Sequence, residues 1–298
     1  MSDFKVWKKQ QGSKSALIFP QNIGPYISID ETALSKGELY TIITNKKAKG
    51  KKGSIVGIFP GTKVEPIIEL ILKIPRRERL KVKEITLDMA NSMKTIAGQC
   101  FPAAIQVTDR FHVQKLTIEA LQEIRIKHRW EAIDLENHQI KEAKSKGKRF
   151  SPVEFSNGDT RKLLLARSRY LLYKSPNHWT ENQKVRALIL FNEYPDIKIA
   201  FDLVQGLRNI FNTSKSIHIA YTKLAHWYKD VELAGFKSFN TIVNTMSINY
   251  RSILNYFMNR STNASAESFN AKIKAFRSQF RGVKDVKFFL YRLSKIFA

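Results

Sequence analysis

The first part of the chain alternates between short apolar runs and polar turns, a pattern that predicts β-strands. Three such runs follow one another closely, at 26–30 (YISID), 39–44 (LYTIIT) and 54–59 (SIVGIF). The connection between the second and third, 45–53 (NKKAKGKKG), is rich in Gly and Lys, which suits an exposed hairpin turn and does not suit a buried crossover. The three strands are therefore expected to form an antiparallel meander.

Beyond residue 60 the spacing of apolar positions changes. Residues 64–74 carry apolar side chains at i, i+3, i+4 spacing, which predicts an amphipathic helix that Pro75 ends. Strand patterns at 82–87 and 103–108 flank a second helix, predicted at 91–100. The order is βββαβαβ. With right-handed crossovers, this order predicts a five-stranded mixed α/β sheet of the ribonuclease-H-like type, with two parallel strands beside the first.

Helical periodicity replaces the strand patterns from about residue 113 to residue 258. The clearest amphipathic segments are 163–173 and 185–194, each with one apolar face. We interpret three tryptophans of this region as core anchors rather than as platforms for base stacking: Trp130, Trp179 and Trp227. The sequence therefore predicts a mixed sheet interrupted by a large all-helical insertion, which ends before one last helix at 264–276.

The composition adds a large imbalance of charge. Lys and Arg together number 51 and Asp and Glu 26, which gives a net charge of +25. A polyanionic partner is expected, nucleic acid first, because neutralising phosphates releases condensed counterions. No apolar run approaches the roughly 18 residues of a spanning helix, and residues 1–11 lack the apolar core of a secretory signal. We therefore expect no membrane partner and a cytoplasmic location.

Three carboxylates are placed to converge. Asp30 ends the first strand and Asp88 the fourth, and the predicted order makes these strands parallel neighbours, so both side chains emerge at one carboxyl edge. Glu267 lies on the last predicted helix and supplies a third acid. Oxygen-only ligation suits Mg²⁺ or Mn²⁺. Two such ions about 3.5–4 Å apart support in-line phosphodiester displacement, so the sequence predicts metal-dependent chemistry on nucleic acid.

Four phrases carry a resemblance to a DDE-type insertion-sequence transposase of the ISL-three family: IDE at 29–31, LDMA at 87–90, FPAAIQVTDRFHV at 101–113 and NASAESFNAKIKAFR at 263–277. The resemblance implies a two-metal-ion polynucleotidyl transferase whose catalytic and metal-binding residues are Asp30, Asp88 and Glu267. Asp109 and His112 then match a C/D-x-x-H motif that related families carry between the second and third acids, which makes them accessory residues. Asp109 also ends a strand, so it stays the alternative second acid.

The resemblance also implies how the chain is divided. We predict a basic N-terminal segment (1–22), the first part of the ribonuclease-H-like catalytic domain (23–115), a helical insertion (116–258), and a catalytic helix with a basic tail (259–298). Transposases of this family usually begin with a Cys-rich zinc-binding segment and a helix-turn-helix. This chain has one cysteine, Cys100, which excludes an internal disulfide and a Cys-based zinc ribbon within it.

The resemblance also indicates which partners to expect. They are double-stranded DNA, as element ends and target, a separate N-terminal DNA-binding polypeptide that reads the ends, and further copies of the chain on DNA. Residues expected to contact DNA are Lys272, Lys274, Arg277, Arg281 and Arg110. Three alternatives stay open: a non-catalytic basic DNA-binding protein, a ribonuclease-H-like nuclease, and an inactive truncated transposase. The first predicts that the three acids do not converge, and the long helical insertion argues against the second.

Overall fold

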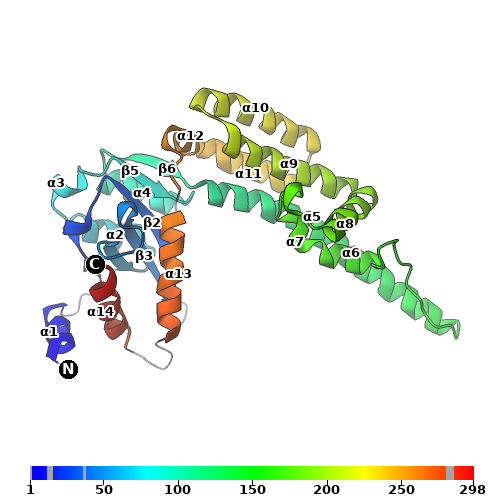
Figure 1. Cartoon of the computed structure of the whole chain (residues 1–298), viewed down its shortest axis with the longest axis horizontal. Helices are drawn as coiled ribbons and strands as arrows, with labels where there is room; N and C mark the ends of the chain where they lie inside the picture. Colours follow the sequence, from blue (N-terminus) through cyan, green and yellow to red (C-terminus); the bar gives the residue numbers. More distant parts are fainter. Residues whose placement is uncertain (1, 12–15, 36–37, 263, 280–284) are drawn as a thin grey trace. The chain divides into compact units, whose positions relative to one another are not determined.

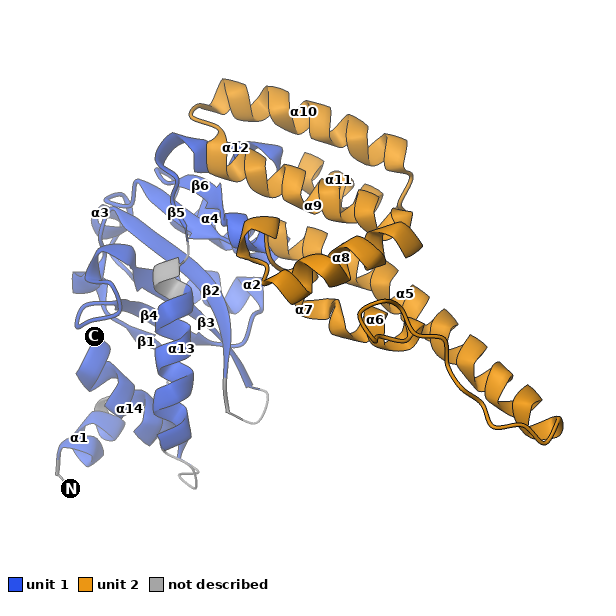
Figure 2. Ribbon diagram, turned by 45° about the vertical axis from the view of Figure 1, so that its right-hand side comes forward, with its two compact units in different colours: residues 1–112, 249–298 blue, residues 113–248 orange. Residues whose placement is uncertain are grey.

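The computed structural model of the chain describes residues 2–11, 16–35, 38–262, 264–279 and 285–298. The chain divides into two compact units (Figure 2): unit 1 comprises Met1–His112 and Asn249–Ala298, and unit 2 comprises Val113–Ile248. Unit 1 is α/β and unit 2 is helical. The functional division that the sequence suggested stays a prediction, and the compact units have boundaries of their own.

Unit 1 is built on a mixed six-stranded sheet (Figure 1) in the order β1-β4-β3-β2-β5-β6. The strands are β1 (Leu17–Ile18), β2 (Tyr26–Ser35), β3 (Glu38–Asn45), β4 (Ile55–Pro60), β5 (Glu84–Leu87) and β6 (Ile105–Thr108). Strands β1 to β4 pair antiparallel, whereas β5 is parallel to β2 and β6 is parallel to β5. The five predicted strands are confirmed. The sixth, β1, has two residues, which are too few to show an alternating pattern.

Helices cover both faces of this sheet because both faces of its strands are apolar. On one face, α2 (Val64–Ile71) and α4 (Asn91–Cys100) pack on residues such as Ile27, Ile29 and Ile85. On the other face, α13 (Ala264–Gln279) and α14 (Val286–Phe297) pack on Ile42 and Ile58. Unit 1 is therefore a three-layer α/β structure, compatible with a ribonuclease-H-like fold.

Helix α12 (Tyr250–Asn259) returns the chain to the sheet of unit 1. The hydroxyl groups of Ser252 and Thr108 lie 2.8 Å apart, and Asn255 Nδ2 donates to the backbone oxygen of Gln106 at 2.9 Å. These bonds attach α12 to β6 just before the chain enters α13. The remaining helices of unit 1 are α1 (Ser2–Gln11) and α3 (Arg76–Arg79), with the 3₁₀ turns η1 (Pro20–Asn22) and η2 (Lys46–Ala48).

The helices of unit 2 are α5 (Arg110–Ser145, which begins in unit 1), α6 (Arg161–Arg167), α7 (Arg169–Leu172), α8 (Glu181–Glu193), α9 (Pro195–Thr213), α10 (Ile217–Ala234) and α11 (Lys237–Ile248), with the 3₁₀ turn η3 (Pro176–His178). Trp227 is buried and donates its indole N–H to the backbone oxygen of Leu203 at 2.8 Å. Trp179 stacks on Phe201. The expectation for Trp130 is wrong: its side chain is 60% exposed, because it lies on the face of α5 that no other described element covers.

Candidate active site

Three aspartates stand at the carboxyl edge of three adjacent parallel strands. Ser28 of β2 lies opposite Thr86 of β5, and two residues later on these strands come Asp30 and Asp88. Asp109 follows β6 directly, and its backbone N–H donates to the carbonyl of the last residue of β5 at 3.0 Å. Side chains alternate between the faces of a strand, so residues at matching positions of parallel neighbours share a face. The pairing of β2 with β5 was predicted from the sequence and is confirmed.

Asp30 is held by two donors. Its Oδ1 accepts from the backbone N–H of Glu31 at 2.8 Å, and its Oδ2 accepts from Asn270 Nδ2 at 2.6 Å. Asn270 is buried on α13, one turn after Glu267. This bond ties the helix of the third acid to the strand of the first. Helical spacing puts Asn270 on the same face of the helix as Glu267, but no local pattern indicates its contact with Asp30, because the two residues lie far apart in the chain.

Asp88 and Asp109 each cap the turn that follows their strand. Asp88 Oδ1 accepts from the backbone N–H of Ala90 at 2.8 Å, and Asp109 Oδ1 accepts from that of Phe111 at 3.2 Å. Asp88 is half-buried, whereas Asp109 is 1% exposed. Asp109 Oδ2 is buried with no hydrogen-bond partner among the described residues. A buried carboxylate oxygen without a donor is costly, so this atom fits a bound cation.

Glu267, in the first turn of α13, comes close to the DRFHV motif. Among the described residues, one set of three ligand atoms lies within 4.8 Å of one another, and it comes from Asp109, His112 and Glu267. Asp30 and Asp88 stand outside this set. The sequence analysis named all five of these residues as candidates, and the family resemblance gave Asp109 and His112 an accessory role. The metal-binding set Asp30, Asp88 and Glu267 stays a prediction.

The carboxylates oppose one another electrostatically. Burial raises the pKa of Asp30, and the charges of Asp88 and Asp109 raise it further, against the N–H of Glu31 and the charge of His112. Burial also raises the pKa of Glu267, and Asp109 and Asp30 add to that rise while His112 opposes it. A cluster of acids whose pKa values are raised by one another is characteristic of a cation site. Its geometry and its charge therefore point to the same ligand chemistry.

A buried ion pair on β5, the strand that leads to Asp88, was not predicted from the sequence. Lys46, at the start of the β3–β4 turn, donates its Nζ to Thr86 Oγ1 at 2.7 Å and lies 3.6 Å from Glu84 Oε1. The two charged side chains are 14% and 4% exposed. Asn259, the last residue of α12, donates to Glu84 Oε2 at 3.1 Å. The available signal was the alternation in β5, which puts Glu84, Thr86 and then Asp88 on one face.

The pKa of Lys46 is lowered by burial, which the charges of Glu84 and Asp109 oppose. The sequence analysis predicted that the lysines of this turn are exposed to solvent. That prediction is wrong for Lys46, because its side chain reaches Thr86 and Glu84 on β5 instead of extending into solvent. Lys47, the next residue, is exposed.

The residues predicted to contact DNA have different environments. Lys274 is exposed, and Lys272 donates to a backbone carbonyl of the β3–β4 turn at 3.2 Å. The Arg277 guanidinium lies 5.1 Å from the centroid of a phenylalanine ring of α14. Arg110 is half-buried at the start of α5. Arg281 lies outside the described residues. Their contacts with DNA stay predictions.

Replacing Asn270 tests the link between α13 and β2. Asn270→Ala leaves Asp30 Oδ2 without its donor, and groups that orient a metal ligand in this way are worth about 10–100-fold in metal affinity. We expect the Mg²⁺ concentration at half-maximal thermal stabilisation to rise by about that factor. Ser268→Ala, at an exposed position of the same helix, is the control. Equal Mg²⁺ midpoints in wild type and both variants would contradict this role.

Acids at the carboxyl edge of a mixed sheet, with a helix-borne glutamate beside them, define a class: an α/β protein with a candidate divalent-metal site of the kind used on nucleic acid. The model of the ISL-three family of DDE transposases, described as a transposase, matches residues 27–293. The chain belongs to this family of transposases. No curated protein matches the sequence well enough to be reported as a relative. Within the described part of the chain, every helix is too short or too polar to cross a bilayer.

Proposed function

We propose that this transposase cleaves DNA and transfers strands with a divalent cation held by Asp30, Asp88 and Glu267. The observation that supports the proposal best is the gathering of acids from distant parts of the chain, Asp30 and Glu267 among them, with raised pKa values. Acids that repel one another in this way lower the stability of the folded protein unless a cation compensates them. The DNA-recombination role of the family gives that cation a use.

Asp88 is the second catalytic acid in this proposal, and Asp109 with His112 supports it. A ligand that shares its ion with a DNA phosphate has to face the substrate, and Asp88 is the more exposed of the two aspartates. Asp109 lies within 4.8 Å of both His112 and Glu267 by its ligand atom. In this arrangement Asp109 and His112 order the site around Glu267, and the charge of His112 offsets part of the repulsion between the two acids. Asp109 remains the alternative second acid, and replacement of the two aspartates separates the assignments.

The side chains have separate tasks. Asp30, Asp88 and Glu267 bind the cation, Asn270 and the N–H of Ala90 orient the first two of these acids, and His112 offsets part of the negative charge. Mg²⁺ or Mn²⁺ held at such a site would activate a water or a DNA 3′-hydroxyl as the nucleophile and would stabilise the leaving oxygen. The reaction class that fits is phosphodiester cleavage followed by strand transfer.

The same proposal gives the units their roles. Unit 1 is the ribonuclease-H-like catalytic domain, and unit 2 is a helical insertion that precedes the helix of Glu267 in the sequence. Duplex DNA is held through phosphates by the excess of Lys and Arg, which gives affinity with little sequence selectivity. The site of action is the nucleoid of a bacterial cell.

Metal titration tests the proposal. At an Mg²⁺ concentration of about 100 times Kd, binding to the folded state alone adds about 2.7 kcal/mol, or about 5–10 °C in Tm for a domain of this size. We expect that shift in wild type, together with cleavage of DNA that carries the element's ends. Ca²⁺ should support DNA binding with little cleavage, because it relaxes the octahedral geometry that the reaction needs.

EDTA and Glu267→Gln are the controls for this titration. Folding raises the pKa of Glu267, so the stability this carboxyl contributes is present at low pH and is lost as the pH rises through the folded pKa. Glu267→Gln should therefore raise Tm at neutral pH in EDTA and reduce the Mg²⁺ shift. Undiminished cleavage in EDTA would refute the metal mechanism. Duplex binding without any cleavage in Mg²⁺ or Mn²⁺ would identify a non-catalytic DNA-binding protein.

A further inference from the structure

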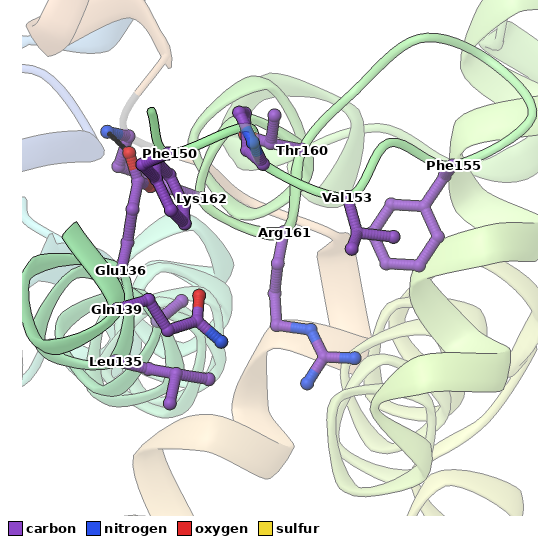
Figure 3. Close-up of a pocket in the computed structure, with 11 residues that line it drawn as sticks. Leu135, Glu136, Gln139, Phe150, Val153, Phe155, Thr160, Arg161 and Lys162 are labelled. Atoms are coloured by element: carbon purple, nitrogen blue, oxygen red, sulfur yellow. Dashed lines mark hydrogen bonds and ion pairs between the residues drawn. The ribbon is translucent and has the colours of Figure 1, made fainter. Parts of the chain in front are cut away.

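The outer half of α5 has one face that its own unit covers. Ala132, Leu135, Glu136 and Gln139 line a hollow of about 290 Å³ against the segment 150–162. Figure 3 shows Leu135 and Gln139 on the side of α5 that faces Arg161 of that segment. Glu136 Oε1 also accepts from Lys162 Nζ at 2.7 Å. This face of the helix is occupied within the unit.

The opposite face carries apolar side chains that remain accessible. Five residues, here called the outer stripe, follow one another at spacings of four, three, four and three: Ile126, Trp130, Ile133, Asn137 and Ile140. Ile126, Trp130 and Ile140 are 42%, 60% and 40% exposed. At 100° per residue the centre of the outer stripe lies about 130° around the helix from the centre of the hollow. Its spacing is the a/d pattern of a coiled coil and is narrower than the apolar face of a core helix.

Asn137 marks what kind of partner fits. The a/d pattern places Trp130 and Asn137 at a positions and the three isoleucines at d positions. A single polar residue at an a position fixes register and number of strands at a cost in stability, which is a feature of coiled coils. A core-facing stripe gains nothing from such a residue. The position of Asn137 therefore points to a helical partner.

The charges beside the outer stripe select the direction of pairing. In a parallel pair, Arg129 meets the partner's Asp134, and this contact joins opposite charges. Glu136, which would lie opposite the partner's Lys141, is already paired with Lys162 of its own chain, so Arg129 and Asp134 carry the argument. In the antiparallel register that keeps the apolar residues together, Asp134 meets the partner's Asp134 and Lys127 meets the partner's Lys141. Those contacts join like charges. The charge pattern is therefore complementary to itself only in the parallel arrangement.

We propose that the outer stripe of α5 is a parallel, in-register homodimer interface, whose occupant is the same stripe of a second copy of this chain. Helix α5 is already formed in the folded unit, so pairing does not pay for helix nucleation. The stripe is short and contains Asn137, so the expected Kd is on the order of 10 μM. The interface does not depend on the acids of unit 1, and its test is independent of catalysis.

Charge reversal in the full chain, followed by sedimentation velocity without DNA, tests the proposal. We expect a monomer–dimer equilibrium in wild type, with Kd raised about tenfold or more in Arg129→Glu and in Asp134→Arg. The contact occurs twice in a symmetric dimer, and each copy becomes a like-charge pair. The double variant Arg129→Glu/Asp134→Arg restores opposite charges and should recover the wild-type Kd. Both side chains are exposed, so folding is not at stake.

Matched variants control for net charge. Arg149→Glu alters the charge by the same amount as Arg129→Glu, and Glu142→Arg by the same amount as Asp134→Arg, and both lie off the outer stripe at exposed positions. These controls should dimerise as wild type does. A chain that stays monomeric at about 200 μM, well above the Kd expected from the stripe, overturns the proposal. A double variant as weak as the single ones also overturns it.

A cysteine placed on the outer stripe tests the register. In the parallel arrangement residue 140 meets residue 140 of the partner, so Ile140→Cys should form a disulfide-linked dimer with oxidised glutathione. In the antiparallel arrangement it meets the partner's Trp130 and should not. Glu142→Cys, on another face, is the control, and the native Cys100 is buried. A cross-link that is no faster in Ile140→Cys than in Glu142→Cys overturns the parallel register.

Discussion

Asp88→Asn and Glu267→Gln are each expected to reduce DNA strand cleavage by about 1,000-fold or more while leaving duplex affinity nearly unchanged. Loss of a ligand removes several kcal/mol of transition-state stabilisation, and about 4 kcal/mol corresponds to that factor in rate. Affinity for duplex DNA depends mainly on phosphate contacts of basic residues. The measurement pairs single-turnover cleavage of DNA carrying the element's ends with a binding titration at the same salt concentration.

Two further substitutions show which aspartate is the second catalytic acid and whether any carboxylate near the site matters. Asp109→Asn should impair cleavage less than Asp88→Asn, because the expected role of Asp109 is accessory: it orders the site around Glu267. If Asp109→Asn is inactive and Asp88→Asn is active, Asp109 is the second acid. Glu31→Gln is the matched control, since Glu31 follows Asp30 on the same strand and projects from the other face. It removes a carboxylate beside the site and should leave cleavage close to wild type.

Lys46→Met is expected to lower the free energy of unfolding by about 3–5 kcal/mol, the usual cost of removing one partner of a buried ion pair. The substitution leaves Glu84 buried without its cation, at 4% exposure. Urea unfolding followed by circular dichroism measures the change, with an unaltered denaturant slope as the sign of an intact fold. Lys47→Met, at the neighbouring exposed position, should change stability by less than about 0.5 kcal/mol.

The double variant Lys46→Met/Glu84→Leu separates the ion pair from simple packing. Replacing both charges with apolar groups removes the unpaired carboxylate, so most of the loss in Lys46→Met should be recovered. Equal losses in the single and double variants would show that Lys46 contributes through its methylene groups instead. Retention of cleavage activity in the double variant would show that this pair stabilises the sheet without entering the chemistry.

Local patterns predicted much of unit 1, because its strands bury side chains with a strict period of two and its helices with a period near 3.6. Helix α4 has the bounds that the pattern gave, Asn91–Cys100. The bonds of Lys46 and Asn270 had no signal that specified their partners. Each joins parts of the chain that are far apart, and only the packed arrangement of sheet and helices decides which polar atoms meet.

The candidate acids were found because strand ends in a parallel pair share an edge, which is a rule of topology. That rule does not predict which three ligand atoms lie closest together, because their distances depend on side-chain rotamers and on the angle at which α13 approaches the sheet. The prediction that Trp130 is a buried core residue was wrong for a different reason. A large apolar residue on a long helix is usually buried, and the exception here carries the interface proposed above.

The order of folding is set by the place of Glu267 in the chain. Asp30, Asp88 and Asp109 all precede unit 2, and Glu267 follows it, so the acids meet only after the intervening segment has been made and its ends brought together. Contacts of such high sequence separation form late, because the entropy of loop closure precedes their gain. If the proposed mechanism is correct, a chain still leaving the ribosome lacks the complete acid cluster and could not cut DNA until Glu267 has been made and folded into place.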